Sequence, residues 1–391
     1  SPAIIFIALS SILKGYFYGT ERVSIPAIID IGEKLIRLLF IIFFTRFFIN
    51  YGIEYVCAGA MLSMVCGEII SLILLSLAYK NKKRVPICPN KTDTSFSIIK
   101  NILVTFIPLS ISASINNIMD MIDAVLIPSQ LRKAGLSKTN SLSTFGILTG
   151  MILPLVYFPT IIIGSLSTTL IPSIAYSYKT KNYIALNKKC NDSITIASVV
   201  GFAASIIFIA YPQELCTAFF NCPEAERLLF WASLPCLFEY YLFILLSIMN
   251  GVSLQRKVLE SSAINIFIMT LSIIFLMPIP ELNIYAYIIG FLLSTSFVVF
   301  KCISTIIKKT TIKFQIFNTV VKPFLCSLLM LITVKSMNNY LIIYTPTQYN
   351  MILSYCIGLL VYFTMLFITK TFTPKQILNV IKIKGLNKSI S

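Results

Sequence analysis

The 391-residue sequence contains no histidine, a single tryptophan and few charged residues. Histidine is the commonest metal ligand and proton shuttle in proteins, so its absence removes the usual basis for both kinds of site. The motifs of nucleotide-hydrolysing, serine-nucleophile, zinc-protease and kinase sites are also missing. The ten cysteines are scattered singly, without a CxxC pair, and we interpret them as small packing residues. The sequence therefore predicts no enzyme, no catalytic residue, no cofactor and no metal site.

Apolar residues, by contrast, are abundant. Hydrophobic residues make up 57% of the chain and charged residues 12%, and the mean hydropathy is +0.86. Apolar runs of about 17 to 25 residues, the length that crosses a bilayer, recur along the whole sequence. We predict an all-α polytopic membrane protein without a separate soluble domain. Its eleven predicted helices cover residues 2–18, 26–49, 54–79, 101–127, 146–175, 193–211, 228–249, 258–277, 284–307, 319–337 and 350–369.

The basic residues predict the orientation. Lysine and arginine outnumber aspartate and glutamate by 32 to 15. If the predicted helices alternate across the membrane, most of the basic residues fall on one side, which the positive-inside rule makes cytoplasmic. This excess needs no nucleic-acid partner. This orientation places the C-terminus in the cytoplasm and the first residue, Ser1, outside. The chain also lacks an initiator methionine, so we expect an odd number of further helices before Ser1.

Charged side chains are concentrated in the second predicted helix. Asp30, Glu33, Lys34 and Arg37 recur at helical spacing and share one face. Asp30 with Lys34 and Glu33 with Arg37 are expected to pair four residues apart, and a rise of about 1.5 Å per residue puts Arg37 near the midplane. One interpretation is a self-neutralised structural cluster. The other is a substrate cavity in which the Arg37 guanidinium binds a phosphate.

Further acidic residues lie inside predicted spans. Glu68 and Glu239 have no basic neighbour in the sequence, so each either meets a cation across the bundle or is protonated. They are candidates for proton or sodium coupling, or else hydrogen-bonded packing residues. Asn116, Asp120 and Asp123 share a helical face near the outer end of residues 101–127 and are expected to form an outer gate. Pro154, Pro159 and Gly164 are expected to interrupt the next helix.

Two stretches resemble a known transporter family. They are "SSILKGYFYGTERVSIPAIIDIGEKLIRLLF" and "FIPLSISASINNIMDMIDAVLIPSQLRKAGLSKTNSLSTFGILTGMILPLVYFPTIIIGSLSTTLIPSIAYSY". Both are similar to the stage V sporulation protein B group of polysaccharide-biosynthesis transporters. This group belongs to the multidrug/oligosaccharidyl-lipid/polysaccharide exporter superfamily, as do the lipid II flippases. The resemblance implies a fourteen-helix, two-lobe exporter fold of which the three N-terminal helices are missing here.

The resemblance also implies a division of the chain. Residues 1–79 would be the remainder of the N-terminal lobe, 80–100 a basic cytoplasmic linker, 101–370 the C-terminal lobe with the last helices, and 371–391 a basic cytoplasmic tail.

The implied function is transport in the bacterial inner membrane. The expected substrate is a lipid-linked saccharide of the undecaprenyl type, a peptidoglycan, spore-cortex or polysaccharide precursor, flipped by alternating access with Na+ or H+ coupling. Membrane lipid is the other expected partner. One alternative is a cation-coupled multidrug or organic-cation antiporter, with Asp120 and Asp123 as its cation site. A second is a membrane scaffold for cell-wall enzymes that transports nothing.

Overall fold

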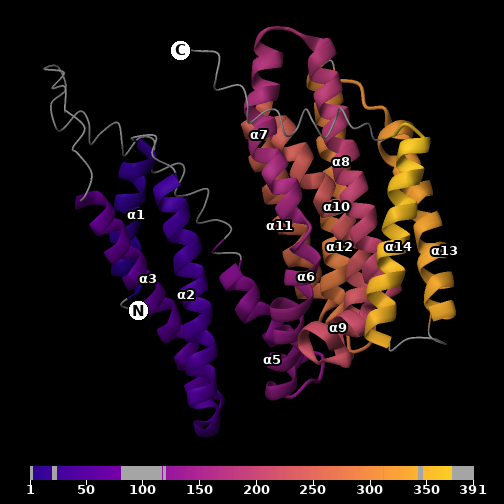
Figure 1. Cartoon of the computed structure of the whole chain (residues 1–391). Coiled ribbons are helices and arrows are strands. Elements are labelled where there is room, and N and C mark those ends of the chain that lie inside the picture. Colours follow the sequence, from indigo (N-terminus) through magenta and orange to yellow (C-terminus); the bar gives the residue numbers. More distant parts are fainter. Residues whose placement is uncertain are drawn as a thin grey trace, which may run out of the picture. The chain divides into compact units, whose positions relative to one another are not determined.

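The computed structural model describes residues 3–19, 24–80, 117, 120–310, 312–341 and 347–371 (Figure 1). Asn116 and almost all of the expected linker and tail lie outside these residues. Within the described ranges every regular element is a helix, and nine helical spans are long and apolar enough to cross a membrane. This confirms the predicted all-α polytopic membrane fold. The chain divides into two compact units, residues 1–102 and 103–391, which are described separately below.

Unit 1 consists of α1 (Ala3–Gly19), α2 (Ser24–Phe48) and α3 (Ile53–Lys80). A short 3-10 turn, Ile49–Tyr51, and Gly52 connect α2 to α3, and the positive φ of 111° at Gly52 suits glycine. The buried face of α3 carries a small residue at every fourth position, namely Gly59, Ser63, Gly67 and Ser71. Small residues allow helix backbones to approach closely in membranes, so this stripe lets α3 pack against both α1 and α2.

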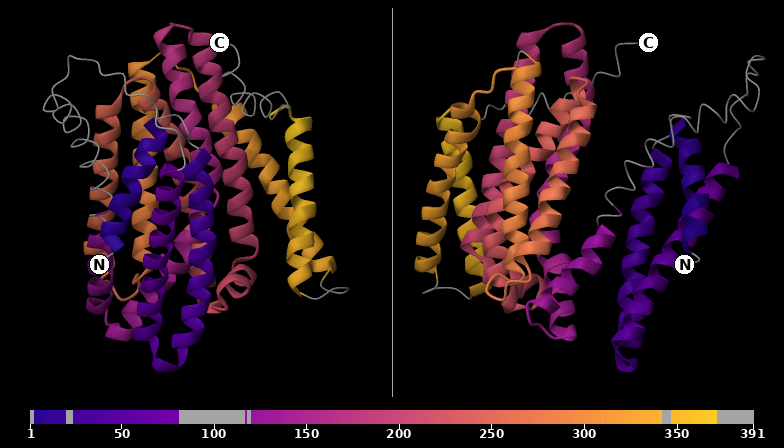
Figure 2. Two further views of the ribbon diagram at one scale, coloured as in Figure 1. Left: turned by 60° about the vertical axis from the view of Figure 1, so that its left-hand side comes forward. Right: turned by 180° about the vertical axis from the view of Figure 1, so that it is seen from behind.

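Unit 2 contains all the remaining helices. They are a helical segment at 120–133, α5 (Lys138–Ile147), α6 (Leu153–Tyr157), α7 (Thr160–Lys179), α8 (Tyr183–Ala210), α9 (Pro212–Phe220), α10 (Glu226–Gly251), α11 (Gln255–Leu276), α12 (Tyr285–Lys309), α13 (Lys322–Leu341) and α14 (Thr347–Ile368). Helix α10 is central and packs against α7, α8 and α12. Helices α13 and α14 form a pair at one edge of this unit (Figure 2).

Two apolar clusters hold unit 2 together. The larger one joins α7, α8, α10 and α12, and the smaller one joins α8 to α13 and α14. Two tyrosines of α14 donate hydrogen bonds to backbone carbonyls of α8, Tyr355 to Ala203 at 3.1 Å and Tyr362 to Val199 at 3.3 Å. Many large apolar side chains on the outside of these helices remain exposed, as expected for surfaces that face lipid.

The predicted helix at 146–175 is broken and begins earlier than expected. It starts at Lys138 as α5, passes through a π-helical turn at Leu148–Ile152 and becomes α6. A turn at Phe158 and Pro159 then separates α6 from α7, because proline cannot donate the next helical hydrogen bond. The interruption expected at Pro159 is confirmed. Pro154 lies in the first turn of α6, directly after the π-helical turn, and the interruption expected at Gly164 is wrong, because α7 is continuous there. The short helix α9 was not predicted, since its nine residues are fewer than a membrane-spanning pattern requires.

Candidate functional site

The charged residues of unit 1 form one interhelical cluster. Nη2 of Arg37, on α2, lies 3.1 Å from Oε1 of Glu68 on α3 and also pairs with Glu33 one turn earlier. The side chains of Glu33 and Glu68 are only 6% and 13% exposed. The expected pairing of Glu33 with Arg37 is therefore present. Glu68, which has no basic neighbour in the sequence, meets its cation across the bundle.

A second ion pair joins α1 to α2. Nζ of Lys14 lies 2.7 Å from Oδ1 of Asp30. The expected partner of Asp30 was Lys34, and that expectation was wrong: Lys34 is exposed and makes no ion pair within the described part of unit 1. Lys14 comes from a neighbouring helix, so spacing within α2 could not reveal it. Ser10, also on α1, donates a hydrogen bond to Oε2 of Glu68 at 3.4 Å.

The carboxylates of the cluster outnumber its cations by one. The cations Lys14 and Arg37 face three carboxylates, those of Asp30, Glu33 and Glu68. In this arrangement the Arg37 guanidinium is already neutralised, and an incoming phosphate would have to compete with two carboxylates for it. On α3, Gly67 leaves room for the Arg37 side chain to pair with the glutamates, because a Cβ at Gly67 would lie 3.3 Å from Nε of Arg37.

Unit 2 contains an acidic cavity of about 270 Å³. Asp120 and Asp123 line it from the helical segment 120–133, and Glu239 lines it from α10. The remaining polar groups come from three further helices: Tyr157 at the end of α6, Asn265 on α11, and Tyr287 and Ser294 on α12. The sequence suggested an outer gate at Asp120 and Asp123 and a separate coupling site at Glu239. The structure instead brings the three carboxylates to one space.

No described lysine or arginine lines this cavity, and none of its three carboxylates makes an ion pair with a described residue. Ionised carboxylates that share a cavity repel one another, and an apolar surrounding disfavours their charge further. The arrangement therefore favours binding of a proton or another cation. The described residues include no group of three or more cysteine, aspartate or glutamate side chains placed to hold a metal ion.

Glu239 also lines a second cavity, of about 230 Å³. This cavity shares Asn265 with the first one and adds Ser261 and Ser262 of α11. Each cavity is large enough for several waters, since one water occupies about 30 Å³ in the liquid. Sequence reasoning missed Asn265, Tyr157 and Tyr287. Their only sequence signal is a polar or aromatic residue inside an apolar run, which many packing residues share.

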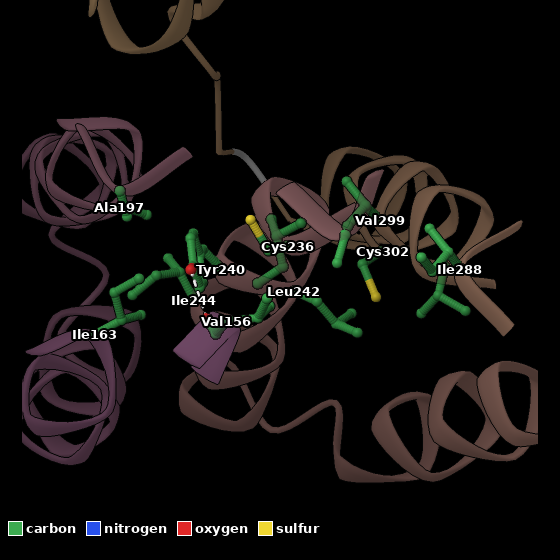
Figure 3. Close-up of a cluster of buried hydrophobic side chains, with 14 of the residues drawn as sticks. Val156, Ile163, Ala197, Cys236, Tyr240, Leu242, Ile244, Ile288, Val299 and Cys302 are labelled. Atoms are coloured by element: carbon green, nitrogen blue, oxygen red, sulfur yellow. Dashed lines mark hydrogen bonds between the residues drawn. The ribbon is translucent and has the colours of Figure 1, made fainter. Parts of the chain in front are cut away.

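Tyr240, the residue after Glu239, stabilises the chain at the break between α6 and α7. Tyr240 is fully buried, and its hydroxyl donates a 2.7 Å hydrogen bond to the carbonyl of Val156, near the end of α6 (Figure 3). A carbonyl next to a helix break lacks its usual amide partner, and a buried one requires a substitute. Tyr240 supplies that substitute, and α10 thereby ties the acidic cavity to the segment that carries Tyr157.

The sequence comparisons find flippase relatives. No protein-family model matches the chain. Stage V sporulation protein B of Bacillus subtilis (strain 168) is 28% identical over 291 residues, covering 73% of this chain and 55% of that protein. Lipid II flippase MurJ of the same strain is 24% identical over 295 residues, covering 68% of this chain and 52% of that protein. The chain thus spans about half the length of the curated relatives it matches.

The fold is also that of a solved flippase. A structure of lipid II flippase MurJ in an inward closed conformation aligns with a TM-score of 0.63 and 18% identity, covering 93% of this chain and 71% of that one. At this identity the match shows the fold alone. The chain is a multi-pass membrane protein, similar in sequence to stage V sporulation protein B and to lipid II flippase MurJ, and similar in fold to a solved MurJ.

Proposed function

We propose that the chain acts in a flippase that moves a lipid-linked cell-wall or polysaccharide precursor across the bacterial inner membrane. The precursor would be of the peptidoglycan or spore-cortex kind, carried on an undecaprenyl-type lipid. Relatives named as a lipid II flippase and as a stage V sporulation protein support this substrate class. Alternating access with a cytoplasmic C-terminus remains the expected mode.

The observation that carries the proposal is the acidic cavity of unit 2. Asp120, Asp123 and Glu239 line it without a basic partner among the described residues. In the membrane such carboxylates bind protons or cations, and movement of these down their gradient can do work on a substrate. Because Glu239 lines both cavities, it is the best-placed group to exchange a proton or cation between them.

The cluster of unit 1 contributes differently under this proposal. Glu33 and Glu68 hold Arg37, so its primary role is to tie α2 to α3. Binding of a substrate pyrophosphate by Arg37 stays a prediction, and it requires the substrate to displace at least one of these carboxylates. Coupling through Glu68, the other carboxylate expected to couple, would require it to leave Arg37 and Ser10.

The test is a transport measurement on neutralised acids. Glu239→Gln and Asp123→Asn are expected to lower the appearance of precursor at the outer leaflet at least about tenfold, the effect of about 1.4 kcal/mol on the transport barrier. The assay uses cells that depend on this protein, with its membrane abundance measured in parallel. The control is Glu260→Gln, which removes an exposed acid that pairs with Lys257 on α11.

Two outcomes would contradict different parts of the proposal. Normal transport in both variants would refute coupling through the acidic cavity while leaving the flippase function intact. A wild-type protein that moves no precursor would refute the flippase function itself.

A second candidate function follows from the same cavity. An acidic space lined by Tyr157 and Tyr287 also suits an organic cation, which aromatic faces and carboxylates both attract. The chain would then be a multidrug or organic-cation antiporter. If Asp123→Asn abolishes dye efflux from vesicles while precursor transport persists, the antiporter function is favoured.

A further inference from the structure

A third cavity, of about 440 Å³, lies in unit 2 away from the acidic one. It is formed between the beginning of α8 and the segment that leads from α12 to α13. Its lining includes Asn187, Lys188, Asn191, Lys313 and Gln315. The lining residues of α8 are 120 or more positions away in the sequence from those of the segment between α12 and α13. The cavity therefore exists only because the tertiary structure brings the two elements together.

Two asparagines of α8 fix the shape of this cavity. Oδ1 of Asn187 accepts a 2.7 Å hydrogen bond from the backbone amide of Lys313, and Oδ1 of Asn191 accepts a 2.8 Å bond from that of Gln315. The side-chain amide of Asn191 also donates to the Lys313 carbonyl at 2.9 Å. Because the asparagine side chains are occupied in this way, they hold the backbone of residues 313–315 against α8.

The remaining charges favour an anion. Lys188 and Lys313 are exposed and line the cavity, and Asp192 is the acidic residue among the described lining residues. These residues together carry one net positive charge, which complements the single negative charge of a phosphodiester. Lys189, the next residue, is engaged elsewhere: its Nζ donates to the carbonyl of Ser173 at 3.0 Å and to Oγ of Ser177 at 2.9 Å.

The surroundings indicate a lipid as the source of that anion. Ile184, which also lines the cavity, is 86% exposed, and the neighbouring Tyr183 is 41% exposed. Both lie in the first turn of a membrane-spanning helix, and the polar residues Asn187, Lys188 and Lys189 follow in its second turn. Tyrosine and lysine at the end of such a helix typically lie at the level of the lipid headgroups, with apolar side chains directed toward the acyl chains.

We propose that this cavity binds the headgroup of an anionic phospholipid, with the phosphodiester at Lys188 and Lys313 and the acyl chains along Ile184. The bound lipid would bridge α8 and the segment that leads to α13, and so stabilise the attachment of the α13 and α14 pair. The proposal does not depend on what the protein transports.

The experiment measures the thermal unfolding of the purified chain in a neutral detergent. Short-chain phosphatidylglycerol is titrated against phosphatidylcholine of the same chain length. In the wild type, phosphatidylglycerol is expected to raise the midpoint in a saturable way. In Lys188→Gln with Lys313→Gln, affinity should fall about thirtyfold, because each lysine near a membrane surface contributes about 1 kcal/mol to anionic lipid binding.

The control removes two basic residues from the ends of other helices in unit 2, Lys257→Gln with Lys308→Gln, and should keep the wild-type shift. The backbone hydrogen bonds of Lys313 do not need its side chain, so the test variant is expected to fold. An equal loss in both variants, or no shift in the wild type, would overturn the proposal. Inorganic phosphate that displaces the lipid and reproduces the shift alone would make the ligand a soluble phosphate instead.

Discussion

Replacing Arg37 by methionine tests whether the unit 1 cluster is held by charge. The substitution keeps an unbranched apolar side chain but leaves Glu33 and Glu68, which are 6% and 13% exposed, without their shared cation. Removing one partner of a buried ion pair costs about 3 to 5 kcal/mol. Because 26% of the Arg37 side chain is accessible, we expect the lower end, a loss of about 3 kcal/mol in the free energy of unfolding.

The assay is unfolding of the purified chain in mixed micelles, followed by circular dichroism. Trp231, the single tryptophan, lies in α10, so its fluorescence separates unfolding of unit 2 from that of unit 1. Adding Glu33→Gln and Glu68→Gln to Arg37→Met should restore stability to within about 1 kcal/mol, since no unpaired charge then remains.

The matched control for this prediction is Lys34→Met. It removes a cation from the same helix that is exposed and makes no ion pair within the described part of unit 1, so it should change stability by less than about 0.5 kcal/mol. The reasoning is refuted if Arg37→Met costs no more than Lys34→Met, or if neutralising both glutamates fails to rescue it.

Three further substitutions test packing, each read from the same unfolding curve. Gly67→Ala should cost about 1 kcal/mol, because its methyl group would lie 3.3 Å from Nε of Arg37 and would weaken the ion pairs. Tyr240→Phe should cost about 1 to 3 kcal/mol by leaving the buried carbonyl at the end of α6 without a donor. Gly251→Ala should cost about 1 to 3 kcal/mol, since its Cβ would lie 2.6 Å from Ile174. An unchanged midpoint would contradict the corresponding contact.

The acids inside the helices of the two units have opposite surroundings. In unit 1, Glu33 and Glu68 share a cation and Asp30 has its own. In unit 2, the half-buried Glu239 and Asp123 and the exposed Asp120 line a cavity to which no described lysine or arginine contributes. Stability explains the first arrangement, because a paired charge costs less in an apolar surrounding than a free one. The second arrangement has no such explanation, and we propose a role in transport for it.

Sequence reasoning found the acids but only one of their partners. Glu33 with Arg37 could be predicted because both lie on one helix, four residues apart, where spacing fixes geometry. The partner of Asp30 could not, because Lys14 reaches it from another helix. Asp123 was expected near the outer end of its helix, in a gate separate from Glu239. In the structure the two residues line the same cavity.

The sequence by itself determined that this protein is a helical membrane protein, where most of its spans lie and which known proteins it resembles, because hydropathy and motif similarity are local properties of the chain. Only the tertiary structure decided which charges are neutralised and which share a cavity. It also decided that Tyr240 supports the break before Pro159 and that Asn187 and Asn191 hold residues 313–315. Those contacts depend on how helices distant in sequence pack together, which no spacing along one helix can specify.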